Sequence, residues 1–99
     1  MRVFFERTGG FAGRKIQGSL DSSSLAASKA RRLRALLDRS RFFDLPPMLE
    51  SDEAGADRFH YRITVETERG AHTVEAADAA VPRLMRPLLD FLARSIAEK

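Results

Sequence analysis

The chain has 99 residues, 43% hydrophobic and 31% charged, a balance that predicts one globular domain over residues 1–99. It has no cysteine, which excludes a disulfide framework and thiolate chemistry, and its formal net charge is only +3 at pH 7. The first residues are too short and too charged to form a signal peptide, and no stretch approaches the roughly 18 apolar residues of a membrane span. We therefore expect a cytoplasmic protein without a membrane partner.

A hairpin is predicted at the start of the chain. Residues 2–7 contain a run of valine and phenylalanine that favours a strand. Over residues 14–20 apolar or small residues alternate with polar ones, which is typical of a half-buried strand. The glycine-rich segment between them predicts the loop of this hairpin.

That loop holds one large apolar ring, Phe11, in the sequence Gly9-Gly10-Phe11-Ala12-Gly13. Glycine adopts positive φ and lets a foreign backbone approach closely, and full burial of a Phe side chain is worth roughly 1.5 to 3 kcal/mol. The segment therefore predicts a loop that offers Phe11 to a pocket on another protein. The alternative is that Phe11 folds back onto the sheet edge and caps the domain's own core.

A basic amphipathic helix is predicted over residues 25–40. Residues 21–24 are typical N-cap residues, and leucine and alanine then recur at helical spacing. Six basic residues and one acidic residue lie between positions 29 and 41, whereas five acidic residues and no basic residue lie between positions 44 and 57. We therefore expect a basic helix followed by an acidic loop.

The segment between that helix and the acidic loop is predicted to add apolar residues but no strand. Phe42, Phe43 and Leu45 are expected in the core. Pro46-Pro47 is expected to end regular structure, since proline has no backbone N–H and restricts the residue before it.

A second hairpin and a second helix are predicted in the remainder of the chain. Residues 59–65 alternate strictly between apolar and polar, Gly70 supplies a turn, and a returning strand follows around residues 73–75. The last helix is predicted over residues 81–96. Pro87 either kinks this helix or marks its true start, and we favour a kink. The order ββαββα predicts an α+β fold: a four-stranded antiparallel sheet made of two hairpins, with two helices packed on one face.

Enzymatic chemistry is not indicated. His60 and His72 lie on different strands of the second hairpin, with His72 expected opposite Glu66 and His60 about 20 Å further along the sheet, so they share no metal ion. The serines at positions 22–24 are expected to be helix caps rather than nucleophiles, and no metal or phosphate motif is present. The sequence predicts no enzyme, no cofactor and no metal site of its own.

The basic helix leaves a second class of function open, a small module that binds nucleic acid or an acidic partner. Arginines on one face can meet phosphates. Arg31 and Arg34, however, share their face with Asp38, and the other basic residues are spread over further faces. We therefore favour a solvated helix surface and do not expect nucleic acid as the partner. A third alternative is a structural accessory domain with Phe11 buried.

Four segments, in this order, resemble the emfourin family. They are Gly9-Gly10-Phe11-Ala12-Gly13, Phe42-Phe43-Asp44-Leu45-Pro46, Asp57-Arg58-Phe59-His60-Tyr61-Arg62-Ile63-Thr64-Val65 and Pro87-Leu88-Leu89-Asp90-Phe91-Leu92. Emfourins are small bacterial protein inhibitors of thermolysin-like (M4) metallopeptidases, usually of the protealysin type. The similarity extends over nearly the whole chain and implies an inhibitor without catalysis of its own that protects the producing cell from its own peptidase.

The resemblance also implies which residues meet the peptidase. Phe11, with Ala12 beside it, would fill the apolar pocket of the enzyme, and the glycines at positions 9, 10 and 13 would shape the loop. A carboxylate oxygen binds zinc at about 2.0 to 2.2 Å and could displace the attacking water. Asp57 is the first choice for this ligand, with Asp52, Glu53 and Glu50 as alternatives. Asp57 has a structural alternative too, as a turn cap or as an ion-pair partner of Arg58 or of a helix arginine.

Overall fold

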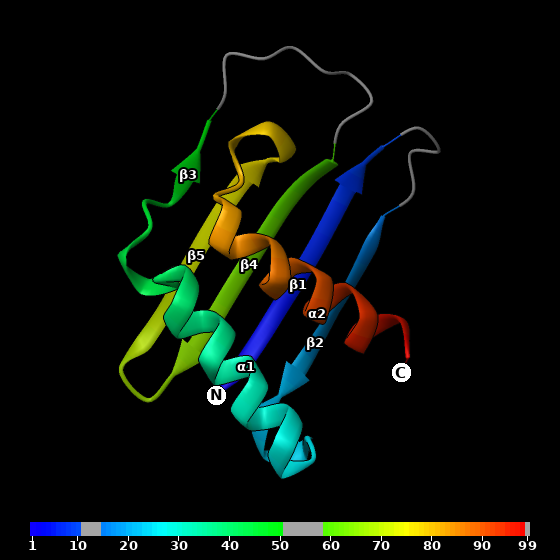
Figure 1. Cartoon of the computed structure of the whole chain (residues 1–99), viewed down its shortest axis with the longest axis vertical. Coiled ribbons are helices and arrows are strands. Elements are labelled where there is room, and N and C mark those ends of the chain that lie inside the picture. The colour runs from blue at the N-terminus through cyan, green and yellow to red at the C-terminus, as the bar shows by residue number, and fades with distance from the viewer. Residues whose placement is uncertain (11–14, 51–58, 99) are drawn as a thin grey trace.

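A computed structural model describes residues 1–10, 15–50 and 59–98 of the chain. Its sheet has the strand order β2-β1-β4-β5-β3 (Figure 1). The strands are β1 (Arg2–Gly9), β2 (Ile16–Asp21), β3 (Met48–Leu49), β4 (Phe59–Thr67) and β5 (Gly70–Ala77). All neighbours are antiparallel except β3, which runs parallel to β5.

The short strand β3 makes the prediction of four antiparallel strands wrong. Met48 lies opposite Glu75 and Leu49 opposite Ala76, which adds a fifth, parallel strand at the sheet edge. The backbone N–H of Glu75 also donates to the carbonyl oxygen of Pro47 at 2.9 Å. Proline lacks a donor but keeps its acceptor, so Pro46-Pro47 does not prevent the next two residues from joining the sheet.

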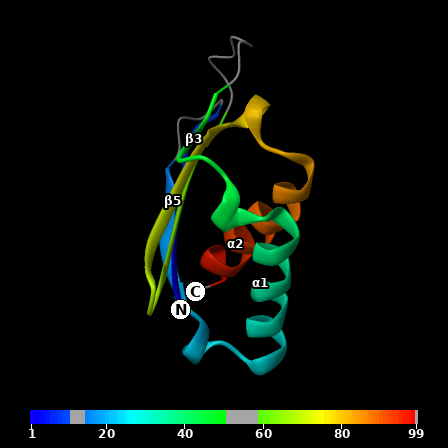
Figure 2. The same cartoon turned by 90° about the vertical axis from the view of Figure 1, so that its left-hand side faces the viewer.

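Both helices, α1 (Ala27–Ser40) and α2 (Arg86–Ala97), pack on one face of the sheet and leave the other face open, as Figure 2 shows. The predicted alternation in β4 explains this, because Tyr61, Ile63 and Val65 point to the helices and are buried. The helices bury a leucine stripe against them, formed by Leu33, Leu36, Leu37, Leu88, Leu89 and Leu92. The prediction of two helices on one face is confirmed.

The second helix is not kinked at Pro87. It begins at Arg86, so Pro87 lies in its first turn, where proline costs no hydrogen bond. The 3-10 turn Arg83–Met85 lies where the sequence predicts the start of this helix, and a further 3-10 turn, Asp78–Ala80, precedes it.

The first helix begins at Ala27, two residues later than predicted, because the residues before it form a separate turn. Asp21 caps the 3-10 turn Ser22–Ser24: its carboxylate accepts hydrogen bonds from the Ser23 hydroxyl at 2.8 Å and the Ser23 N–H at 3.0 Å. These two hydrogen bonds lower the pKa of Asp21, since they favour its charged form. The cap residues thus serve the turn and not α1.

The helix end and the residues after it also differ from the prediction in part. Arg41 ends α1 in the left-handed region, with φ of 54°, and turns the chain so that Phe42 is fully buried. Phe43 is 48% exposed, so its predicted place in the core is wrong. Consecutive residues in a tight turn point in different directions, so only one of the two rings reaches the core.

Candidate functional site

Only part of the predicted partner-binding set is described by the structure. Gly9 and Gly10 lie at the end of β1. The other members lie outside the described residues: Phe11, Ala12, Gly13, Asp52, Glu53 and Asp57. The strand ends on either side of them are described, and they establish where the two predicted loops begin and end.

These strand ends meet at one end of the sheet. Gly9 lies opposite Phe59 in the pairing of β1 with β4, and Arg7 lies opposite Ile16 in the pairing of β1 with β2. The strands β1 and β3 therefore end, and β2 and β4 begin, at the same end of the sheet (Figure 1). We call this the loop end, defined by Gly9, Gly10, Ile16 and Phe59.

Both glycines at the loop end have backbone angles that L side chains rarely adopt. The φ angle is 86° at Gly9 and 80° at Gly10. A Cβ atom added to Gly10 would lie 2.4 Å from Cε1 of Phe59, which is closer than two non-bonded carbon atoms can approach. The ring of Phe59 therefore lies directly against Gly10, and this position needs glycine for two separate reasons.

The ring of Phe59 is also in contact with a cation. The guanidinium carbon of Arg7 lies 4.4 Å from the ring centroid, within the range of a cation–π interaction. Nε of Arg7 is buried and has no hydrogen-bond partner among the described residues. Phe59 in turn lies beside Tyr61, with ring centroids 6.1 Å apart. Arg7, Phe59 and Gly10 thus form one packed group at the loop end.

The sequence analysis placed Phe59 at the start of a strand and in a segment that resembles the family, but it gave neither Phe59 nor Arg7 a role in binding. The strand alternation does put Phe59 on the same face as Tyr61, which was a usable signal. Its contact with Gly10 depends on the register between β1 and β4, in which Gly9 pairs with Phe59, a residue far along the chain. No local pattern reports that register.

Hydrogen bonds to Asp78 connect the start of α2 to the same end of the sheet. Arg86 donates to the Asp78 carboxylate through Nη1 at 2.8 Å and to the Asp78 carbonyl through Nη2 at 2.7 Å, while the Tyr61 hydroxyl donates to the carboxylate at 3.3 Å. The hydrogen bond to Asp78 raises the pKa of Arg86. Burial, followed by the charge of Asp78, raises the pKa of Tyr61.

The two histidines take separate structural positions. His72 lies opposite Val65, so the predicted pairing with Glu66 is wrong by one residue. Its Nε2 lies 3.0 Å from the Leu45 carbonyl oxygen and its ring packs edge-on against Phe42. His60 is on the open face, with Nε2 3.5 Å from a carboxylate oxygen of Glu75. Within residues 1–10, 15–50 and 59–98, no three metal-binding side chains gather at one place.

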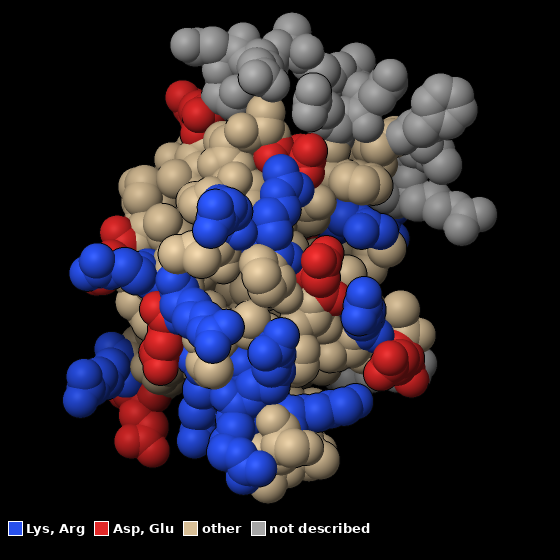
Figure 3. All heavy atoms as spheres, viewed as in Figure 1, with Lys and Arg blue, Asp and Glu red and all other residues tan. Residues whose placement is uncertain are grey.

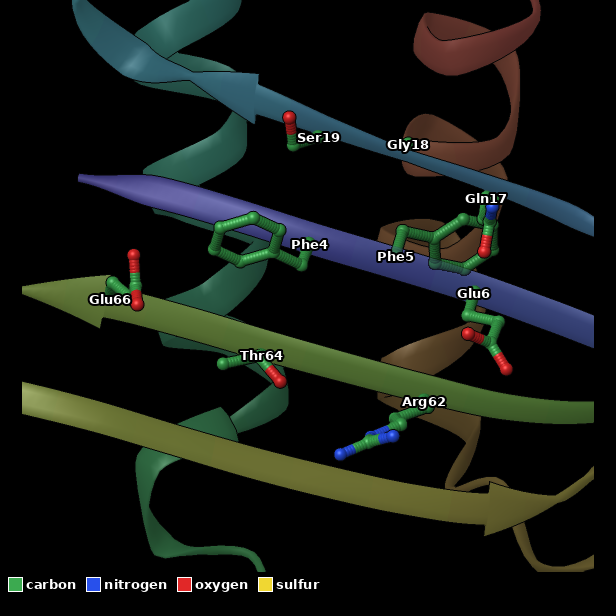
Figure 4. A pocket seen from close by; sticks show the side chains of 9 residues that line it. All are labelled: Phe4, Phe5, Glu6, Gln17, Gly18, Ser19, Arg62, Thr64 and Glu66. Carbon is green, nitrogen blue, oxygen red and sulfur yellow. The ribbon is translucent and has the colours of Figure 1, made fainter.

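A shallow hollow of about 590 Å³ lies on the open face of the sheet. Figure 4 looks onto this face with the helices behind it, and shows that Phe4 and side chains of both charges line the hollow, among them Glu6, Arg62 and Glu66. Its lining comes from β1, β2 and β4 and does not include Phe59 or either glycine of the loop end. The hollow is therefore separate from the loop end.

The predicted basic surface lies on the helix side. Lysine and arginine side chains gather over α1 in Figure 3, and Arg31 and Arg34 are both exposed there. An acidic residue lies within this basic surface, since Nζ of Lys29 is 3.6 Å from a carboxylate oxygen of Glu98. Neither helix in the described part of the chain has the length and hydropathy needed to cross a membrane.

Comparison with known proteins identifies one family. The model of the family named Emfourin matches residues 5–93. Among solved structures, emfourin from Serratia proteamaculans, an M4 family peptidase inhibitor, is similar at 15% sequence identity with a TM-score of 0.49, over 91% of this chain and 86% of that one. No curated protein matches the sequence significantly.

Proposed function

The chain belongs to the Emfourin family, and from this membership we propose that it inhibits a thermolysin-like (M4) zinc metallopeptidase, of the protealysin type, by binding across its active-site cleft. Emfourin is a family of inhibitors, so the protein is not an enzyme. The proposal includes the surface that binds, namely the loop end and the two segments that leave it, residues 11–14 and 51–58.

The observation that supports this surface is the pairing of Gly9 with Phe59. The segment with Phe11 leaves β1 immediately after Gly10, and the acidic segment enters β4 at Phe59. Two segments distant in sequence are therefore anchored on neighbouring strands. A stable protein interface usually buries about 1,200 to 2,000 Å², which is more than one short loop supplies. Two segments anchored side by side are a better basis for such an area.

We propose that Phe11 is the apolar anchor and that Asp57 is the carboxylate directed to the zinc ion of the enzyme. Asp57 precedes Phe59 by two residues, and Phe59 pairs with the strand that leads to Phe11. Asp52 and Glu53 follow β3, which lies at the far edge of the sheet beyond β5. Of the candidate carboxylates, Asp57 is nearest in sequence to the strand that pairs with β1, which supports it over Asp52, Glu53 and Glu50.

The direct test is a titration of a purified thermolysin-like peptidase with the intact protein. We expect activity to fall in proportion to the added protein and to reach zero near one equivalent, with the inhibitor recovered uncut by mass spectrometry. A peptidase that keeps its activity at a large excess of the protein would contradict the proposed function. So would loss of activity that requires cleavage of the added chain, because that is the behaviour of a competing substrate.

A further inference from the structure

We propose that Phe59 and Arg7 are positioning residues for the inhibitory loop: together they fix the direction in which the chain leaves β1 at Gly10. The inference rests on the proposed function, since it concerns how the segment after Gly10 is presented to the peptidase. It differs from that function in assigning a role to two residues that lie behind the loop.

The contact between Phe59 and Gly10 restricts the backbone where the chain leaves β1. Glycine can adopt more backbone angles than any other residue. Two glycines in succession would therefore leave the direction of the chain after β1 unrestricted. The ring removes that freedom, because it occupies the space next to the Gly10 Cα, with Cε1 only 2.4 Å from where a Cβ would be. Gly10 is held at φ of 80° against an aromatic surface.

The position of the ring itself is set by Arg7 and by the strand pairing. Phe59 is paired through its backbone with Gly9, and its ring lies 4.4 Å from the Arg7 guanidinium carbon. Among the described residues no carboxylate forms an ion pair with Arg7, and its buried Nε has no hydrogen-bond partner. Stacking on Phe59 is thus the interaction that the structure shows for this guanidinium.

A fixed direction of the chain at Gly10 should strengthen binding. Ordering a flexible loop costs free energy at the moment of association, and a loop whose base is already ordered loses less. A fixed φ of 80° also keeps Gly10 itself out of the extended backbone conformation in which a peptidase binds the chain that it cleaves. Variants of the packed group should therefore bind more weakly and should be cut more readily in the loop, without unfolding.

The test combines inhibition with a measurement that does not involve the peptidase. The variants are Gly10→Ala, Phe59→Ala, their double variant, Phe59→Leu and Arg7→Met. Gly70→Ala is the matched control for Gly10→Ala, since Gly70 also has positive φ but has nothing within 4 Å of an added Cβ. Phe4→Leu is the matched control for Phe59→Leu, since Phe4 is a half-exposed aromatic residue on the opposite face of the same sheet.

We expect Gly10→Ala to weaken inhibition by roughly tenfold to a hundredfold, because backbone strain and the contact with Phe59 each cost about tenfold. In the Phe59→Ala background the same change should cost clearly less, so the two losses do not multiply. Phe59→Leu and, to a smaller extent, Arg7→Met should weaken inhibition and allow cleavage within residues 11–14, whereas both controls inhibit like the unaltered protein. Thermal unfolding confirms that each variant is folded.

In the free protein, NMR should show the Gly10 α protons shifted by the ring current of Phe59, and this shift should disappear in Phe59→Leu. An unshifted Gly10 would overturn the inference, as would losses that multiply or a Phe59→Leu variant that inhibits like the unaltered protein. If the shift is present but the unaltered protein inhibits no thermolysin-like peptidase, the proposed function fails and the contact that orders Gly10 stands. The two failures are therefore distinguishable.

Discussion

Two glycines at opposite ends of β4 have positive φ for different reasons. Gly10, with φ of 80°, lies against the ring of Phe59, the first residue of that strand. Gly70, with φ of 126°, lies opposite Thr67, the last residue, and a Cβ atom there would meet nothing within 4 Å. At Gly70 only the backbone of a hairpin turn requires glycine. At Gly10 a neighbouring side chain requires it as well.

This difference separates a turn that only reverses the chain from a turn that also orders the segment after it. The Gly70 turn has its own local support, since the Arg69 N–H donates to the Thr67 hydroxyl at 3.1 Å. The Gly10 turn depends on Phe59, which is distant in sequence, and on Arg7 beneath the ring. The Gly10 turn is thus ordered by a contact between segments distant in sequence, at the end of the sheet where the two predicted binding segments begin or end.

The largest loss of inhibition is expected from Phe11→Ala, which removes the proposed anchor next to the loop end. Removal of the anchoring ring should cost about 2 to 4 kcal/mol of binding, because a few central residues dominate an interface. The inhibition constant for a thermolysin-like peptidase measures it. The control is Phe43→Ala, which removes an exposed ring outside the loop end. If both variants inhibit equally well, Phe11 is not the anchor.

Gly18→Ala should instead affect the body of the fold. A Cβ atom at Gly18 would lie 2.8 Å from Cγ2 of Ile96, so the Ile96 side chain or the end of α2 would have to shift. Such overpacking typically costs about 1 to 3 kcal/mol, which urea unfolding would measure. Inhibition by the folded fraction should not change. A variant as stable as the unaltered protein would show that Ile96 and α2 accommodate the added methyl group without cost.

Gly70→Ala should lower stability by on the order of 1 to 2 kcal/mol, the usual cost of a left-handed backbone angle for a residue with a Cβ. The inhibition constant should stay the same, since the turn lies at the opposite end of the sheet from Gly9 and Phe59. Urea unfolding and an activity titration measure the two quantities. Weaker inhibition by this variant would mean that the peptidase contacts both ends of the sheet.

Alkaline pH should lower the stability of the folded protein through Tyr61, whose ring lies beside that of Phe59 at the loop end. Its pKa is raised above the ordinary value of 10.0, mainly by burial, so the folded state favours the neutral phenol. The resulting stability is fully present below pH 10 and is lost as the pH rises through the folded-state pKa. Unfolding curves at rising pH should show this loss, and Tyr61→Phe should reduce it. An equal loss in both proteins would assign it to other groups.

The smallest effect on inhibition is expected from the double variant Arg31→Ala and Arg34→Ala. Both side chains are exposed on α1, away from the loop end, so the inhibition constant should stay within about twofold. Binding of a nucleic acid or an acidic protein, if it occurs, should weaken and lose part of its salt dependence. A large loss of inhibition would extend the binding surface to α1.

The elements whose signals are local were predicted from the sequence. The alternation over β4 determined its buried face, and Gly70 marked the hairpin turn. The start of α2 was mispredicted because Pro87 is compatible with either a kink or a first turn. The 3-10 turns before Arg86 decide between them.

The features that depend on pairing between distant segments were not predictable. Strand β3 has only two residues and owes its place to hydrogen bonds with β5, including the one accepted by Pro47. The contact between Phe59 and Gly10 likewise exists only once β1 and β4 are in register. At the candidate site the sequence therefore suggested which side chains would bind, but could not reveal what holds Gly10 in place.

NMR mapping of the labelled protein with an inactive thermolysin-like peptidase would show directly whether the loop end binds the enzyme. We predict that the amide signals of Thr8, Gly9, Gly10 and His60 shift or broaden, while those of Thr67, Arg69 and Gly70 do not. Changes confined to the Gly70 turn or to α1, with the loop end unaffected, would contradict the account.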